Sequence, residues 1–254
     1  ARRAGVQPQG GAVVGFAPDL LHPAIGSGSV TGEPIVAVDH GAQDHVTAYV
    51  LVPDGDGYRL ALAEGPASGG GADLTRAARI VPPGTALRPV PGQSRRLVRE
   101  DLEALTTLGL ALTSADLVGI MRGVIDVTVA YACDRRQYGL AIGSFQAVQH
   151  LLAEARCLME GAYSAALYPA WAVDQLGVDE ARTAAVVAKA YCARAARTVC
   201  ETAIQVHGGI GNTWDCIVHV YLRRALLSTQ WFGDDGEQLR HLERTRLGND
   251  HGLS

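Results

Sequence analysis

The second half of the sequence is a series of long helical patterns, and this feature limits the fold more than any other. From residue 96 to about 136, apolar residues recur at helical spacing with almost no Gly or Pro, which predicts one long helix. The repeat is formed by Leu97, Leu102, Leu105, Leu108, Leu112, Leu117, Ile120, Val124, Val127 and Tyr131. Such a helix needs partners for its apolar face, so the pattern predicts a helical bundle.

Further helices are expected after it. Ser144 is the N-cap candidate of a helix running to about Trp171. Asp179 and Glu180 open the next helix, which has an Ala-rich face suited to close helix contact and ends at Gly208. Two shorter helices are expected over residues 215–231 and 234–244. Long antiparallel helices joined by short connections complete the predicted bundle.

The first half has the pattern of a small β-domain. Strand-length apolar runs occupy residues 11–17, 34–38, 45–52 and 58–63, with a hairpin turn at 53–57. Residues 90–94 lead out of this part as a linker. The sequence therefore predicts an α+β chain, with a β-domain over residues 1–92 and a helical bundle over residues 93–254.

A distinctive motif stands where the first long helix ends. Arg135, Arg136, Gln137 and Tyr138 precede Gly139, and residues 142–150 follow with the sequence Ile-Gly-Ser-Phe-Gln-Ala-Val-Gln-His. Guanidinium groups grip phosphate oxygens, and an amide and an aromatic ring beside them suit a nucleotide. The alternative interpretation is that the arginines only complement the dipole of the helix end.

A second motif follows another predicted helix. Residues 205–211 read Gln-Val-His-Gly-Gly-Ile-Gly, and Arg223-Arg224-Ala225 comes shortly afterwards. Together the two motifs resemble the carboxy-terminal domain of the flavin-dependent acyl-CoA dehydrogenases. That family has an R-x-Q-F-G turn with a downstream F-Q-A, and a Q-x-x-G-G-x-G turn leading to an Arg. The resemblance extends over about residues 30–242.

The resemblance implies a β-barrel-like middle domain followed by a long-helix carboxy-terminal bundle. The amino-terminal helical domain of the family is absent or not included in this sequence. In the family the two turns hold the pyrophosphate and adenine half of an FAD that is bound mainly to the neighbouring subunit. The implied FAD contacts are Arg135, Gln137, Tyr138, Gln146, Gln205, Gly208 and Gly209.

The catalytic base of the family has no counterpart at its usual positions. The reaction removes the proton next to a thioester carbonyl and transfers a hydride to the flavin, so it needs a desolvated carboxylate. Most members place a Glu at the position of Phe232, ahead of Gly233; others place it at the position of Gly109. Asp116 and Glu103 remain as candidates for a relocated base, although a helix-end or solvated carboxylate is the alternative interpretation for both.

Flavin-facing segments of the family are altered as well. A Thr-Glu-x-x-x-Gly-Ser-Asp-type segment would stand near residues 17–22, which lack that pattern. The Thr and Gln that follow the base in many members correspond to Asp234 and Gly236. Asp234 and Asp235 are predicted to cap a helix, and His207 is predicted to pack under its glycine turn.

Composition excludes several other classes of protein. With 48% hydrophobic and 19% charged residues and a net charge of −4, the chain is globular and has no basic surface for nucleic acid. Five cysteines without C-x-x-C spacing indicate a reducing compartment and predict no metal site. No leader sequence or membrane-span-length run is evident, so a cytoplasmic protein is expected. Lys189, the only lysine, suggests no role.

The resemblance leaves three hypotheses. The first is a non-catalytic subunit of a heteromeric acyl-CoA dehydrogenase, of the kind associated with actinobacterial steroid side-chain degradation. It would pair with a related subunit as an α2β2 complex, complete that partner's FAD site, leave acyl-CoA to the partner's site, and pass electrons to an electron-transferring flavoprotein. The second is a homomeric dehydrogenase with a relocated base. The third is a flavin-free scaffold.

Overall fold

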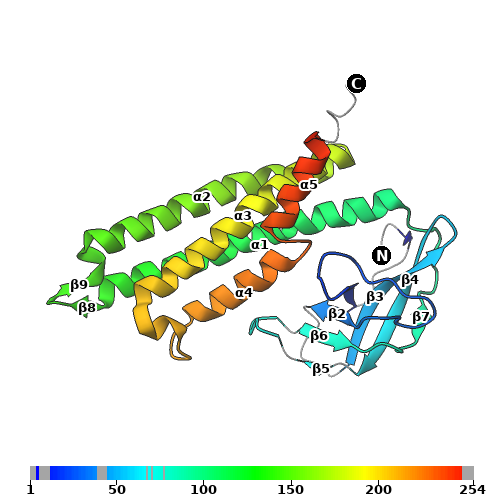
Figure 1. The fold of residues 1–254 in the computed structure, drawn as a ribbon, viewed down its shortest axis with the longest axis horizontal. Coiled ribbons are helices and arrows are strands. Elements are labelled where there is room, and N and C mark those ends of the chain that lie inside the picture. The colour runs from blue at the N-terminus through cyan, green and yellow to red at the C-terminus, as the bar shows by residue number, and fades with distance from the viewer. Residues whose placement is uncertain are drawn as a thin grey trace. The chain divides into compact units, whose positions relative to one another are not determined.

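The computed structural model describes residues 4–5, 12–38, 45–66, 68–69, 71–76 and 78–247. The chain divides into two compact units, Ala1–Thr106 and Thr107–Ser254 (Figure 1). The first unit contains a β-sheet and the second contains helices, as expected for an α+β chain. The predicted domain boundary at residues 92/93 stays a prediction.

The first unit is built on a seven-stranded mixed sheet with the order β5-β6-β2-β1-β3-β4-β7. Its strands are β1 (Val13–Phe16), β2 (Ile35–Val38), β3 (His45–Asp54), β4 (Gly57–Pro66), β5 (Ser68–Gly69), β6 (Ala78–Val81) and β7 (Leu87–Pro89). Only the β1 and β3 pair is parallel. The four predicted runs are confirmed as β1 to β4, although residue 11 lies outside the described residues.

Strand β3 is buried on both faces of this sheet. Val46, Ala48 and Val50 belong to one apolar cluster, whereas Tyr49 and Leu51 belong to another on the opposite face. This explains why the strand reads as a continuous apolar run instead of an alternating one. The predicted hairpin turn joins β3 to β4, where Asp54 pairs with Gly57.

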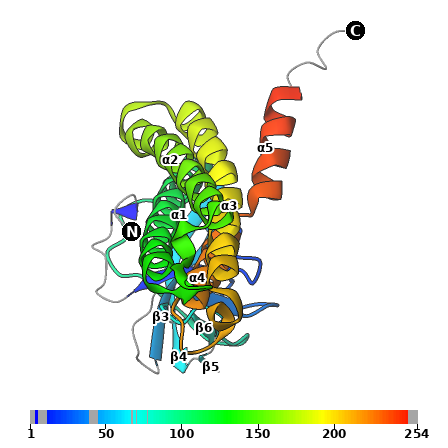
Figure 2. The same cartoon turned by 90° about the vertical axis from the view of Figure 1, so that its left-hand side faces the viewer.

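The five predicted helices are all present (Figures 1 and 2). They are α1 (Arg99–Asp134), α2 (Gln146–Gln175), α3 (Val178–His207), α4 (Val218–Gln230) and α5 (Asp235–Leu247), with short 3-10 segments η2 (Ile142–Ser144) and η3 (Gly208–Asn212). Helix α1 begins at Arg99 because Asp101 Oδ2 accepts a hydrogen bond from the Val98 N–H at 3.0 Å, which satisfies a donor at the helix start.

The predicted start and end of α2 were wrong. Ser144 is not its N-cap, because Ser144 lies in η2 and its hydroxyl donates to the Ala141 carbonyl at 2.7 Å. Phe145 is the N-cap and makes no side-chain cap bond. The helix also runs past Trp171 to Gln175, with Pro169 inside it.

Small residues let the helices of the bundle approach one another. Figure 2 shows α1, α2 and α3 side by side, and their buried residues form one cluster that includes Leu117, Met121, Met159, Ala196 and Val199. A Cβ built on Gly161 of α2 would overlap the hydroxyl end of Tyr191 on α3. The Ala-rich face of α3 is accordingly buried along most of its length.

Helix α1 corrects one expectation about hydropathy. Its length and an 18-residue window of mean hydropathy 1.5 satisfy the criteria for a membrane span, contrary to the expectation that no run approaches that length. More than half of that window, 56%, is buried within the structure. The burial is that of a helix in a protein core, so the apolar run is explained by packing.

Candidate functional site

The first motif forms a two-residue hairpin after α1. Strand β8 (Arg136–Gln137) pairs with β9 (Leu140–Ala141), and Tyr138 and Gly139 connect them with φ values of 53° and 81°. Positive φ at both connecting residues is the geometry of a type I′ turn, which favours Gly at the second position. The turn leaves Tyr138 94% exposed at the tip of the hairpin.

The polar side chains of the hairpin point to solvent. Neither the Arg135 nor the Arg136 guanidinium has an ion-pair partner among the described residues, and Gln137 donates only to the adjacent Arg136 carbonyl, at 3.0 Å. All predicted FAD contacts are exposed, namely Arg135, Gln137, Tyr138, Gln146, Gln205, Gly208 and Gly209. The exposed side chains among them retain hydrogen-bonding capacity for an external ligand, whereas the Gly208 N–H already donates to the carbonyls of Ile204 and Gln205.

The second motif forms a glycine turn at the end of α3. Gly208 has φ 67° and ψ −148°, a conformation essentially restricted to glycine. Gly209 is different, because a Cβ built on it would meet nothing within 4 Å in this chain. Packing within the chain therefore does not require glycine at 209, whereas close approach of a ligand to the backbone would.

A ring stack joins the two motif turns. Tyr131, four residues before Arg135, stacks on His207, the residue before Gly208, with ring centroids 4.1 Å apart. His207 is buried and its Nδ1 lies 2.9 Å from the Ala203 carbonyl oxygen, so its predicted packing under the glycine turn is confirmed. The ends of α1 and α3, with both motifs, therefore lie side by side.

An exposed tryptophan beyond the glycine turn escaped the sequence analysis. Trp214 is 76% exposed, the Arg223 guanidinium lies 5.6 Å from its ring centroid, and His219 meets it edge-on. Arg223 belongs to the Arg pair that follows the second motif. The only sign in the sequence was a Trp three residues after the glycine turn. It suggests no role until the structure places Arg223 against its ring.

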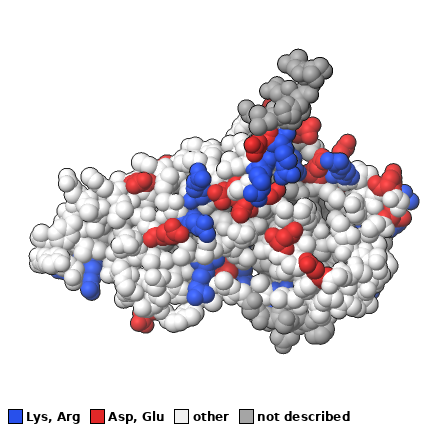
Figure 3. Space-filling view, viewed as in Figure 1, with Lys and Arg blue, Asp and Glu red and all other residues white. Residues whose placement is uncertain are grey.

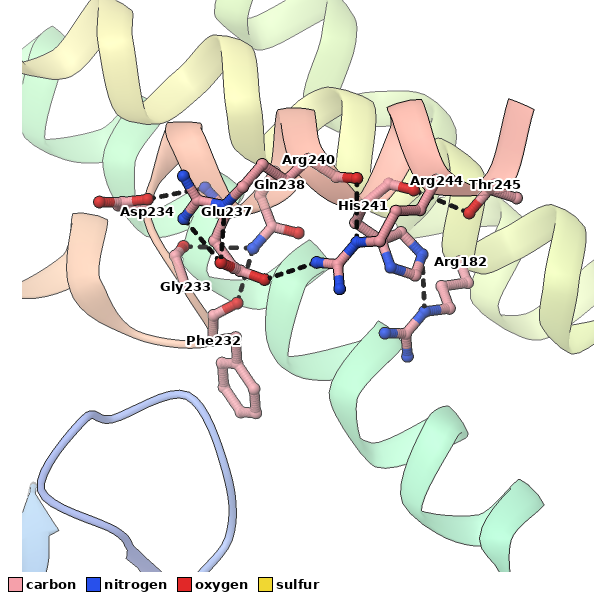
Figure 4. Close-up of polar contacts among 10 residues, drawn as sticks. All are labelled: Arg182, Phe232, Gly233, Asp234, Glu237, Gln238, Arg240, His241, Arg244 and Thr245. Atoms are coloured by element: carbon pink, nitrogen blue, oxygen red, sulfur yellow. Dashed lines mark hydrogen bonds and ion pairs between the residues drawn. The ribbon is translucent and has the colours of Figure 1, made fainter. Parts of the chain in front are cut away.

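The two positions considered for a catalytic base lie against each other. Phe232 is buried, and a Cβ built on Gly109 would overlap its ring. The phenyl ring thus fills the space that a side chain at position 109 would need. Phe232 also has φ 58°, an unusual value for a bulky residue, and its carbonyl accepts a hydrogen bond from Gln238 Nε2 at 2.7 Å (Figure 4).

The alternative carboxylates are engaged by cations of this chain. Asp116 accepts from Arg224 Nη2 at 2.6 Å and from the Ser228 hydroxyl at 2.7 Å, which ties α1 to α4. Glu103 accepts from Arg99 Nε at 2.8 Å, four residues earlier on α1. Both contacts are typical of structural ion pairs, and neither gives a reason to assign a base role.

Several polar groups at the start of α5 stabilise the helix itself (Figure 4). Asp234 Oδ1 accepts from the Glu237 N–H at 2.8 Å, so Asp234 is the predicted cap. Asp235 is not a cap but lies in the first turn, where a negative charge complements the helix dipole. A hydrogen bond from Arg240 and the charge of Arg244 hold the pKa of Glu237 below its usual range.

Residues 17–22, which stand where the resemblance places a flavin-facing segment, form a loop closed by internal hydrogen bonds. Asp19 Oδ1 accepts from the Leu21 N–H at 2.9 Å, and Asp19 Oδ2 lies 3.2 Å from His22 Nδ1. The Ala17 N–H donates to the His22 carbonyl at 2.9 Å. The polar groups of the loop are thus directed to one another. Among the described residues there is no group of three or more His, Cys, Asp or Glu side chains that could hold a metal.

The chain resembles known proteins over most of its helical unit. Residues 106–247 match the model of the acyl-CoA dehydrogenase carboxy-terminal domain. The chain belongs to the acyl-CoA dehydrogenase family. It is 39% identical over 155 residues to the acyl-CoA dehydrogenase FadE34 of Mycobacterium tuberculosis, an alignment that covers 58% of this chain and 22% of FadE34. The chain therefore spans about a fifth of that relative.

Solved acyl-CoA dehydrogenase structures share the fold. The Tcur3481-Tcur3483 steroid ACAD superposes with a TM-score of 0.69 at 22% identity, over 94% of this chain and 68% of the other. The ChsE4-ChsE5 complex from Mycobacterium tuberculosis superposes with a TM-score of 0.67 at 24% identity, over 91% and 62%. These likenesses confirm the predicted fold, a small curled mixed sheet and a long-helix bundle.

Members of the family depend on FAD, and the residues of this chain fit part of that cofactor. The exposed guanidinium groups of Arg135 and Arg136 suit a pyrophosphate, and the open backbone at Gly209 allows close approach. At the two positions where the resemblance places the base, Phe232 and Gly109 offer no proton acceptor for the reacting half. Which residues contact FAD stays a prediction.

Proposed function

We propose that this chain is the non-catalytic subunit of an FAD-dependent acyl-CoA dehydrogenase complex. The observation that carries the proposal is the Phe232 ring, which lies against Gly109 and so occupies both positions where the family carries its base. In the first motif turn, in contrast, the guanidinium groups of Arg135 and Arg136 are exposed and have no ion-pair partner among the described residues. The chain is inferred to complete a binding site without performing the chemistry.

Proton abstraction explains why the partner must supply the base. The α-proton of a thioester is weakly acidic, so its removal needs a desolvated carboxylate and donors on the carbonyl oxygen. When bound in the complex, FAD would supply the hydride acceptor. In this chain a phenyl ring cannot accept the proton, and Asp116 and Glu103 are held by Arg224 and Arg99. The acyl-CoA is therefore assigned to the partner's site.

The role of this chain is to hold the dinucleotide half of the partner's FAD. Arg135 would bind the pyrophosphate through its planar fork, assisted by Gln137 and by the backbone at Gly208 and Gly209. Tyr138, Gln146 and Gln205 would border the adenosine. The Tyr131 and His207 stack keeps the two turns together, so the cradle is formed before the cofactor arrives.

A group of exposed apolar side chains on α2 supports a hetero-oligomer. Tyr163, Leu167, Tyr168 and Trp171 of α2 are each 40–53% exposed, and the last two stack on each other. Figure 3 shows few charges over α2 and the hairpin, whereas charged side chains gather over α5. An exposed apolar surface of this kind marks an interface. We expect an α2β2 complex with a related subunit; a monomer at micromolar concentration in sedimentation would contradict it.

Substrate and acceptor are inferred by analogy. One structural neighbour is described as a steroid ACAD and another as a complex of two proteins, ChsE4 and ChsE5. We infer a steroid side-chain thioester as the substrate class, an electron-transferring flavoprotein as the acceptor, and a cytoplasmic location.

Purification with and without the partner tests the proposal. The chain is purified alone and then with the products of neighbouring genes, and the flavin absorbance of each preparation is recorded. We expect a colourless isolated chain and a yellow complex. A yellow, active isolated chain would favour a homomeric dehydrogenase, and a colourless complex would favour a flavin-free scaffold.

Restoring the missing carboxylate is a second test. Phe232→Glu places a carboxylate at the usual base position, but the flavin-facing segments around residues 17–22 and at Asp234 and Gly236 remain altered. We expect no gain of turnover in the complex whose partner base has been removed. Recovery of turnover in that complex would show that this chain keeps a competent site.

A further inference from the structure

Lys189 is the only lysine of the chain and lies in its interior. The 22 basic residues are Lys189 and 21 arginines. Lys189 stands near the middle of α3 and is fully buried, whereas arginines supply the basic groups of the surface. A buried cation is costly unless every one of its protons is bonded, so this position needs an explanation.

The Lys189 ammonium is surrounded by backbone carbonyls. Its Nζ donates to four carbonyl oxygens, those of Ser228 (3.0 Å), Thr229 (3.0 Å), Trp231 (2.7 Å) and Gly233 (3.2 Å). Two of them belong to the last turn of α4, whose carbonyls lack partners within the helix. The other two belong to the connection between α4 and α5.

The remaining carbonyls of this connection are also paired. Gln238 Nε2 donates to the carbonyls of Phe232 at 2.7 Å and Gly233 at 3.3 Å, and the Gly233 N–H donates to the Gln230 carbonyl at 3.0 Å. Every carbonyl from 228 to 233 therefore accepts a hydrogen bond. The connection is held by side chains from α3 and α5 and not by its own sequence preference, because Phe232 adopts an unfavourable φ of 58° there.

An ammonium suits this arrangement of four carbonyl oxygens better than a guanidinium would. Its three protons diverge tetrahedrally and reach carbonyls arranged around one point, whereas the donors of a guanidinium lie in one plane. Burial lowers the pKa of Lys189 to about 7, and the charges of Asp234 and Asp235 act in the opposite direction. Hydrogen bonds to the charged form and the negative end of the α4 dipole also favour the ammonium.

We propose that Lys189 is the positioning residue of the connection between α4 and α5, and that its charge holds residue 232 against Gly109. The contacts of Lys189 with the four carbonyls fix the backbone around position 232 and so set the direction of its side chain. Lys189 therefore keeps the phenyl ring in the space that a base would need. The interpretation of that space as the place of a missing base rests on the proposed function. The anchoring of the connection by Lys189 does not.

Fluorine NMR on the full chain, with any partner that copurifies, tests the anchor. The chain has only three phenylalanines, so 4-fluorophenylalanine gives three resonances, and Phe232→Leu identifies one of them. Lys189→Met keeps the length of the side chain and removes the charge. Arg194→Met is the matched control, because it removes an exposed cation of the same helix whose long ion pair with Asp235 of α5, at 3.8 Å, does not involve the carbonyls of the connection.

The anchor predicts a selective response. In Lys189→Met the Phe232 resonance should shift or broaden, while the Phe145 resonance, from the hairpin end, stays in place. Arg194→Met should move neither. A Phe232 resonance identical to that of the parent chain in Lys189→Met would overturn the proposal.

Chemical rescue separates charge from packing. Lys189→Ala removes a group equivalent to n-propylammonium, so addition of that cation should return the Phe232 resonance to its original position, whereas 1-propanol should not. Restoration by both compounds would show that only volume matters and would contradict a role for the charge.

The unmodified chain provides a test that does not depend on a variant folding. Isotope-labelled lysine gives a single side-chain signal from this chain, because Lys189 is its only lysine. As pH rises, this signal and the Phe232 fluorine resonance should change together, with one midpoint. A lysine that titrates like a free side chain near pH 10.4, or a Phe232 resonance that ignores its titration, would overturn the proposal. None of these readouts needs flavin or turnover, so their failure is distinct from failure of the proposed function.

Discussion

Two turns of the helical unit differ in whether their polar groups are bonded within the chain. At the hairpin after α1, the guanidinium groups of Arg135 and Arg136 have no ion-pair partner among the residues that the structure describes, and Tyr138 projects into solvent. At the connection between α4 and α5, each carbonyl from 228 to 233 is bonded within the chain, and Phe232 is buried.

The difference separates binding from catalysis. A surface that binds a charged ligand must keep donors available, and the hairpin does so. A catalytic site must keep a proton acceptor available, and the α4 to α5 connection has none at position 232. The hairpin has the first property and the connection lacks the second, which is the combination expected under our proposal of a subunit that completes a partner's site.

The largest expected effect comes from breaking the closed turn. Lys189→Met leaves the carbonyls of Ser228, Thr229 and Trp231 without their donor, so we expect a loss of about 3–5 kcal/mol in the free energy of unfolding. Denaturant titration measures it, with Arg194→Met as the control that should cost little because Arg194 is exposed. A loss equal to that of the control would mean that the turn does not depend on Lys189.

The open turn should show the reverse behaviour, with an effect on ligand binding and none on folding. Arg135→Ala should weaken FAD binding by the complex by about 1.5–3 kcal/mol, roughly tenfold to a hundredfold in Kd, because one charge-assisted contact to a phosphate is lost. The unfolding free energy of the chain should not change. Unaltered flavin affinity and stoichiometry would remove the motif from the account.

Asp116 is expected to matter for stability alone. Asp116→Asn weakens the contacts to Arg224 and Ser228 that tie α1 to α4, so we expect a loss of about 1–2 kcal/mol in unfolding free energy. Arg224→Gln, which alters the same pair from the other side, should cost a similar amount, and the double variant should cost less than the sum. Additive losses would show that the pair is not coupled.

The smallest effect concerns the contact between α5 and α3. Arg182 Nε donates to His241 Nε2 at 3.3 Å, and burial together with the charges of Arg182 and Arg244 lowers the pKa of His241. The unfolded chain therefore takes up this proton first, and stability is complete above about pH 6.5 and falls as pH decreases below it. Because His241 is only partly buried and solvent screens its charge, we expect a loss of at most about 0.5 kcal/mol. His241→Gln should abolish this part of the pH dependence in denaturant titrations.

The sequence predicted most of the elements because their signals are local. The period of α1, the Ala-rich face of α3, the hairpin turn at 53–57 and the glycine after Tyr138 each depend on neighbouring residues. Strands β5 to β7 were missed because runs of two to four residues carry no readable period. Residue 144 was misread as a cap because its hydroxyl serves the 3-10 turn before α2.

The parts of the site that escaped prediction depend on long-range packing. Phe232 and Gly109 are far apart in the chain, and each alone suggests only a missing base; their contact reveals a filled space. Lys189 reads as an ordinary helix residue until the carbonyls of α4 are seen around it. The base hypotheses for Asp116 and Glu103 could not be weighed before their arginine partners were known.

Turnover of the assembled complex tests the central claim most directly. Phe232→Ala, Asp116→Asn and Glu103→Gln should each leave kcat within a few fold of the parent complex, because none of these side chains takes the proton, whereas removal of the partner's base carboxylate should abolish turnover. A fall of about a hundredfold or more in kcat for Asp116→Asn or Glu103→Gln, in a complex that is still assembled and still yellow, would contradict the non-catalytic role and restore a site in this chain.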